Sequence, residues 1–84
     1  MNSIKKDGFI FKMSKRKNKK YSVYKDGKYI TSFGDNRYQQ FKDKIGLYKH
    51  KDHNDKERRK RYYLRFGKET TKYTPKWFSH RYLW

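Results

Sequence analysis

The chain of 84 residues contains no cysteine, no alanine and a single proline. The absence of cysteine excludes disulfide bonds and thiol catalysis, and it fits a reducing compartment. Valine, isoleucine and leucine supply only eight residues, and no apolar run approaches the ~18 residues that a membrane span needs. We therefore expect one small domain with a thin apolar core and no insertion into a membrane.

Acidic residues are also scarce, with 8 carboxylates against 25 lysines and arginines, which leaves a net charge of +17. Few aliphatic residues and a high net charge are typical of disordered chains. Aromatic residues make up 20% of this chain, however, and disordered chains contain few of them. The composition therefore predicts a folded, aromatic core and a polyanionic partner, because so many like charges repel one another unless something neutralises them.

Residues 1–20 are strongly basic and admit two interpretations. Phe9, Phe11 and Met13 alternate with Ile10 and Lys12, which is the period of a β-strand. The segment is either a flexible basic arm or an edge strand followed by a basic loop over residues 14–20. Residues 21–84 are predicted to form a single small α+β domain.

The clearest local signal is a β-hairpin over residues 21–33, centred on Asp26-Gly27, a dipeptide that favours a two-residue turn. This turn predicts three cross-strand pairs, which are Tyr24 with Tyr29, Val23 with Ile30, and Tyr21 with Ser32. It places Tyr21, Val23 and Ile30 on one face of the hairpin and Tyr24, Tyr29, Thr31 and Phe33 on the other.

Three helices are indicated by their ends and their hydrophobic period. Asp35 and Gly46 would bracket a helix over about residues 36–45. Asn54, with Glu57 three residues later, would begin a second helix that ends at Gly67. A third would start at Thr74-Pro75. The core is predicted to contain Val23, Ile30, Tyr38, Phe41, Ile45, Tyr62 and Phe66.

The last segment carries four large rings on a short helix that would not be stable alone. We expect Trp77, Phe78, Tyr82 and Trp84 to dock either on the free face of the hairpin, formed by Tyr24, Tyr29 and Phe33, or on a partner chain.

Basic and aromatic residues alternate most densely over residues 58–65. Cations that bind phosphates beside rings that stack on bases are typical of nucleic-acid-binding proteins. A solvated charged helix face above core tyrosines is the alternative. Arg59 lies within the apolar stripe, where it either faces a ligand or packs internally. The candidate nucleic-acid-binding residues are Lys15, Arg16, Lys17, Lys19, Lys20, Arg58, Arg59, Lys60, Arg61 and Arg65.

Catalysis is not expected. His50, Asp52 and His53 could suggest a metal site or, with Asn54, a nuclease of the His-Asn type, but a zinc site would also need His80 and a carboxylate. The alternative is a polar linker before a helix. The chain has no glycine-rich phosphate loop, no nucleophile elbow and no convincing carboxylate pair. We therefore predict no cofactor, no metal and no enzymatic activity.

Several motifs occur in a characteristic order: KKYSVY at residues 19–24, FGD at 33–35, RYQQFKDKIG at 37–46, His50 with DHND at 52–55, RRKRY at 58–62 and SHRYLW at 79–84. In this order they resemble a family of short basic proteins of unknown function encoded mainly by nucleocytoplasmic large DNA (giant) viruses. The resemblance covers about residues 19–84. Members often have Arg-His where this chain has Arg65-Phe66, which further weakens a metal or nuclease interpretation.

The resemblance implies a viral protein packaged in the virion, which would occur in the cytoplasm or nucleus of the infected cell. We expect an α+β fold, with a β-hairpin or a three-stranded antiparallel sheet packed with two to three short helices and a basic N-terminal arm. The expected function is DNA binding through the phosphate backbone with little sequence specificity, DNA being favoured over RNA. The alternative is a minor capsid or cement protein, a structural protein whose basic surface and rings contact acidic capsid proteins.

Overall fold

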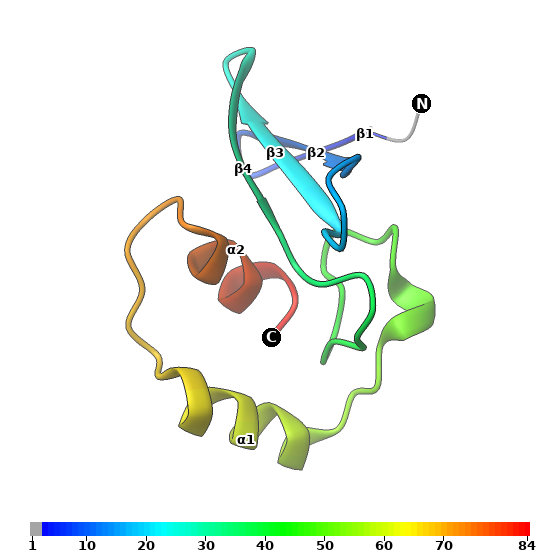
Figure 1. Ribbon diagram of the computed structural model, residues 1–84, viewed down its shortest axis with the longest axis vertical. Helices are drawn as coiled ribbons and strands as arrows, with labels where there is room; N and C mark the ends of the chain where they lie inside the picture. Colours follow the sequence, from blue (N-terminus) through cyan, green and yellow to red (C-terminus); the bar gives the residue numbers. More distant parts are fainter. Residues whose placement is uncertain (1–2) are drawn as a thin grey trace.

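The computed structural model describes residues 3–84, in which a four-stranded antiparallel sheet is followed by two helices (Figure 1). The strands β1 (Ser3–Lys6), β2 (Phe9–Met13), β3 (Tyr21–Lys25) and β4 (Lys28–Phe33) are neighbours in chain order. A short 3-10 turn, η1 (Lys49–Lys51), precedes α1 (Lys56–Phe66) and α2 (Pro75–Tyr82). The predicted α+β class is confirmed, with four strands where a hairpin or three were expected.

Two hairpins of the sheet turn on the same dipeptide. Asp26-Gly27 joins β3 to β4 as predicted, with φ angles of 51° and 77°. Asp7-Gly8 joins β1 to β2 with φ angles of 54° and 81°, and the sequence prediction missed this second signal. Asp and Gly are the residues that adopt positive φ most readily, so each pair sets its turn locally.

The pairing of β3 with β4 follows the prediction only for the residue pair nearest the turn. Tyr24 pairs with Tyr29 as expected, but Val23 pairs with Thr31 and Tyr21 with Phe33. A bulge at Ile30 inserts one residue, which shifts every later partner by one. Because side chains alternate across a strand, this shift moves Phe33 from the predicted outer face to the core face with Tyr21 and Val23.

The core lies between the sheet and α2. The Phe78 ring stacks on Phe33 at 5.4 Å, and Tyr82 meets Phe11 at 4.8 Å. All four of these side chains are at most 1% exposed. The C-terminal segment therefore docks on the sheet of its own chain, but on the face that carries Phe11 and Phe33. Tyr24 and Tyr29, which were predicted to receive it, pair with each other on the opposite face.

The helix predicted over residues 36–45 is wrong. This stretch forms turns and bends, and Gln40 makes an isolated bridge with Asp52. Its main chain bonds outward, because Lys42 and Lys44 donate to the carbonyls of Leu83 and Tyr82. Tyr38 is 64% exposed, so the apolar spacing that suggested a helical face does not mark a buried one.

A buried carboxylate holds the turns of this segment in place. Asp43 is fully buried and accepts hydrogen bonds from the Tyr21 hydroxyl and from the main-chain N–H groups of Ile45 and Tyr48. Asp52 accepts from the main chain of Asp43. These contacts satisfy backbone groups that a helix would have paired within itself, so side chains here replace secondary structure.

Of the seven predicted core residues, Val23 and Ile45 are buried and Ile30, Phe41 and Tyr62 are partly buried. Phe66, at 44% exposed, joins Tyr38 outside the core. The larger core side chains come instead from segments whose partners are distant in sequence. Within the part of the chain that the structure describes, neither helix has the length and apolar character required to cross a bilayer.

Candidate nucleic-acid interface

The helix α1 begins and ends with local signals that set its length. Its N-cap is Asp55, one residue after the predicted Asn54, and the Asp55 carboxylate accepts from the N–H groups of Glu57 and Arg58 at 2.9 and 3.2 Å. Gly67 ends the helix at a φ of 76°, as predicted. The helix therefore spans Arg58, Arg61 and Arg65, whose spacing of three and four residues puts them on one side.

Aromatic and polar contacts attach α1 to the rest of the molecule, and none of its side chains is fully buried. The Tyr62 ring stacks flat on Trp84, with centroids 4.2 Å apart and planes at 4°. The hydroxyls of Tyr62 and Tyr63 reach the Nδ1 atom and the carbonyl oxygen of His80. Desolvation of the phenol raises the pKa of Tyr62. These contacts fix the rotation of α1 about its axis and thereby the direction of its arginines.

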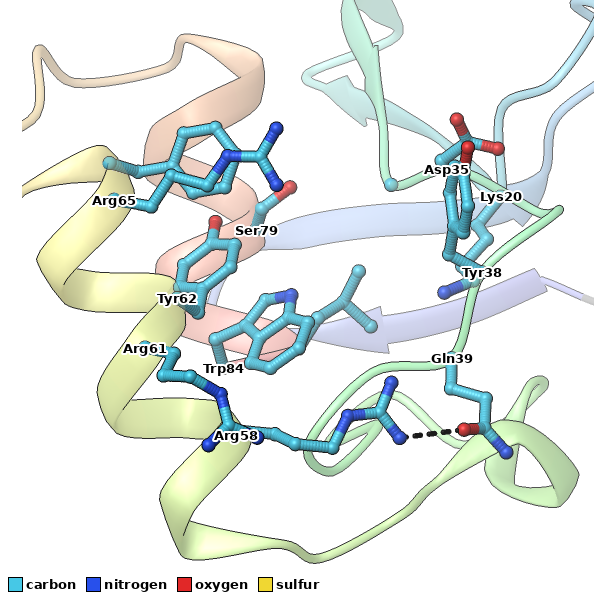
Figure 2. A pocket seen from close by; sticks show the side chains of 13 residues that line it. Lys20, Asp35, Tyr38, Gln39, Arg58, Arg61, Tyr62, Arg65, Ser79 and Trp84 are labelled. Carbon is cyan, nitrogen blue, oxygen red and sulfur yellow. Dashed lines mark hydrogen bonds between the residues drawn. The ribbon is translucent and has the colours of Figure 1, made fainter.

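The arginine side of α1 faces a cleft of about 770 Å³. Its opposite wall is the segment after β4, which contributes Tyr38 and Gln39. Figure 2 shows Arg58, Arg61 and Arg65 extending from α1 on one side, with Trp84 between the walls. A hydrogen bond of 2.8 Å from the Arg58 guanidinium to the Gln39 side-chain oxygen crosses the cleft.

The charge of the cleft is strongly positive. Arg37 and Asp35 form a two-point ion pair, with distances of 3.0 and 2.7 Å, which is the sole carboxylate–cation pair among residues 3–84. Its hydrogen bonds lower the pKa of Asp35 to about 2. Asp35 also lines the cleft, so Arg37 offsets the negative charge there. The guanidinium groups of α1 thus keep their charge available for an anion.

The ten predicted binding residues fall into separate places. Arg58, Arg61 and Arg65 line the cleft together. Lys60 and Arg59 line a second, smaller hollow on another side of α1. Four others lie on the loop between β2 and β3, where they are exposed or partly exposed: Lys15, Arg16, Lys17 and Lys19.

Lys20 differs from the rest because its side chain is only 2% exposed. Its ammonium donates to the side-chain oxygen of Gln40 at 2.5 Å. Burial lowers the pKa of Lys20 to about 8, with the nearby charge of Lys51 as the next cause. Its side chain is therefore buried, unlike those of Lys15–Lys19, and its role in binding nucleic acid stays a prediction.

Arg59 also has an internal partner, which matches the structural alternative at this position. Its Nε donates to the main-chain oxygen of Trp84, and its guanidinium lies over the rings of Phe41 and Tyr63 at 5.2 and 5.3 Å. Such stacking stabilises a cation beside apolar groups. It ties α1 to the segment of residues 40–55 and leaves Arg59 directed away from the cleft.

Two main-chain hydrogen bonds join the end of the basic loop to the segment that lines the cleft. The N–H of Lys20 donates to the Gly34 carbonyl at 3.1 Å, and the N–H of Asn36 donates to the Asn18 carbonyl at 3.4 Å. Gly34 and Lys20 both line the cleft. The fold therefore brings the end of the loop to the wall of the cleft that faces the arginine row, although the two are about forty residues apart in sequence.

The histidines do not converge. His80 contacts Tyr62 and the Gly67 carbonyl, and the Nδ1 atom of His53 accepts from the Asp55 N–H. His53 packs against the rings of Phe41 and Trp84, and desolvation lowers its pKa. Across residues 3–84 no three histidine or carboxylate side chains are grouped so that they could hold a metal ion.

The wall opposite α1 does not follow from the sequence, whose pattern predicts Tyr38 in the core and Gln39 on a helix. The row of arginines was visible from its spacing, whereas the cleft depends on the path of residues 34–40.

Comparisons with protein-family models, curated proteins and solved structures found no match to this chain.

Proposed function

We propose that this chain is a small, virus-encoded nucleic-acid-binding protein, packaged in the virion, that binds the DNA phosphate backbone with little sequence specificity. The viral origin and the packaging rest on the ordered motifs at residues 19–84. The binding rests on one observation, the row of Arg58, Arg61 and Arg65 along a cleft whose carboxylate is already paired.

Guanidinium groups bind phosphates through charge-assisted hydrogen bonds, and they do not need a particular base to do so. Arg61 and Arg65 are exposed, and the Arg58 bond to Gln39 leaves its other N–H groups for a ligand. The exposed cations of the loop, Lys15, Arg16 and Lys17, would extend the contact along the backbone. Shape and charge thus favour a polyanion over a small neutral ligand.

The salt dependence of DNA affinity tests the proposal. Each phosphate neutralised contributes a slope in log affinity against log salt of about −0.9 on duplex DNA and about −0.7 on a single strand. Changing Arg58, Arg61 and Arg65 to alanine is expected to flatten that slope by up to about three units, with equal losses on unrelated sequences.

A matched control removes the same charge elsewhere. Lys28, Lys72 and Lys76 are exposed and do not line the cleft, so their joint replacement by alanine is expected to change the slope much less. Equal effects of the two triple variants would mean that only net charge matters. If the protein ignores DNA at low salt but binds acidic capsid subunits, the minor capsid role replaces this proposal.

A further inference from the structure

The cleft contains exposed rings as well as cations. Tyr38 is 64% exposed and Phe66 is 44% exposed, and both line it. Trp84, held by its stack on Tyr62, also lines the cleft (Figure 2). Large rings are normally placed out of water, so rings gathered at the mouth of a basic cleft mark a surface for a ligand.

Each exposed ring has a guanidinium beside it. The Arg65 guanidinium lies 5.2 Å from the centre of the Phe66 ring, and that of Arg37 lies 5.5 Å from the centre of the Tyr38 ring. A ring offers a face for stacking on a base. The Arg65 cation beside Phe66 suits the phosphate attached to that base, whereas Arg37 beside Tyr38 is paired with Asp35 and leaves the phosphate to the arginines across the cleft. Proteins that bind single strands combine these two groups, because every base has a flat face.

The direction of the arginine row argues against a duplex inside the cleft. A helix that reads duplex DNA presents its side chains outward into a major groove about 12 Å wide. Here the same side of α1 faces Tyr38 and Gln39 across the cleft, and Arg58 is bonded to Gln39. A cleft of about 770 Å³ has the size of a site for a small organic group. An unpaired base can enter such a site without the cost of breaking a base pair.

We propose that the cleft binds single-stranded nucleic acid, with unpaired bases stacked on Tyr38 and Phe66 while Arg58, Arg61 and Arg65 hold the phosphates. This inference rests on the proposed function and specifies its ligand. The backbone contacts carry affinity for any strand, and the rings add affinity only where bases are free.

The test compares two strands of equal charge and about 12 nucleotides, a length within the range of single-strand sites. One is an ordinary mixed-sequence strand, and the other has the same backbone with abasic sites throughout. Fluorescence anisotropy with the full chain is expected to show about 5-fold or tighter binding of the strand with bases, the lower limit for one stacked base. A duplex of the same length is measured in parallel.

A ring-removal variant, Tyr38→Leu with Phe66→Leu, is expected to bind both strands equally, at the affinity of the abasic strand. Tyr38 is mostly exposed, and a leucine at position 66 keeps an apolar contact with the Tyr62 ring, so the thermal midpoint should change little. Leu64→Ala is the control, because Leu64 is 76% exposed on α1 but does not line the cleft. It should keep the preference for bases.

Three results would overturn the inference, and they are distinguishable. Equal binding of both strands by the wild type, with affinity still lost in the arginine variant, would refute base stacking and leave the proposed backbone binding intact. Absence of binding to either strand and to the duplex at low salt would refute both. Tighter binding of the duplex than of the ordinary strand would also exclude the single-strand assignment.

Discussion

Replacing Asp43 by asparagine tests whether a buried carboxylate organises the segment after the sheet. The carboxylate is fully buried. One of its oxygens accepts from the Tyr21 hydroxyl at 2.5 Å and from the Tyr48 N–H at 2.7 Å, and the other accepts from the Ile45 N–H at 2.8 Å. Burying a charge is costly, and bonds of this kind compensate for that cost.

The expected loss in the free energy of unfolding follows from which of the three hydrogen bonds of Asp43 an asparagine amide can still make. The side-chain oxygen of asparagine can still accept from the Ile45 N–H. Its NH₂ group would face the Tyr48 N–H, and two donors would then meet without an acceptor. A hydrogen bond to a charged group contributes about 1.5–3 kcal/mol. The Tyr21 hydroxyl can rotate and accept a hydrogen bond from the asparagine NH₂ group instead. The free energy of unfolding is therefore expected to fall by about 2–4 kcal/mol, which is a large part of the total stability of so small a domain.

Thermal unfolding followed by circular dichroism at neutral pH gives the measurement. A domain of this size loses about 4–8 °C in Tm for each kcal/mol, so Asp43→Asn should lower Tm by about 8–32 °C. Asp26→Asn is the matched control, because Asp26 is exposed in a turn at a positive φ that asparagine also tolerates. A change below about 4 °C for Asp43→Asn would show that the carboxylate does not hold this segment.

Two further outcomes are expected. Gly34→Ala should destabilise the protein by at least about 1 kcal/mol more than Gly8→Ala in urea unfolding. Both glycines have positive φ, but a Cβ at Gly34 would lie 2.9 Å from Leu83 Cδ1 and one at Gly8 would contact nothing, so equal losses would refute the close approach. Because burial lowers the pKa of Lys20 from 10.5 to about 8, the unfolded chain binds more protons between these values, and stability should rise with pH there. Lys20→Met should flatten the rise measured from about pH 8 to 9.5, and an unchanged slope would mean that Lys20 is solvated.

Features set within a few residues could be predicted from the sequence. The Asp26-Gly27 turn, the end of α1 at Gly67 and the start of α2 at Thr74-Pro75 are all observed. The turn requires residues that accept a positive φ, the helix end requires a residue that stops the helix, and the helix start suits a proline, which has no N–H. Each requirement is local, so the residue type at the position is sufficient to recognise it.

The path of residues 34–55 could not be predicted in this way. Its apolar spacing and its end residues match a helix, but Asp43, Gln40 and Asp52 bond to groups that are near only in the folded chain. The bulge at Ile30 is similar, since it brings Phe33 over Phe78 from a helix some forty residues away. Tertiary packing overrides local preference in both places.

The sequence by itself determined the excess of cations and the row of Arg58, Arg61 and Arg65, because charge is additive and helical spacing is regular. Only the tertiary structure decided which cations are bonded to groups of the protein itself. Lys20 lies inside against Gln40, and Arg59 bonds to the main chain of Trp84. Burial and partners depend on contacts between distant segments, and a linear sequence does not contain those distances.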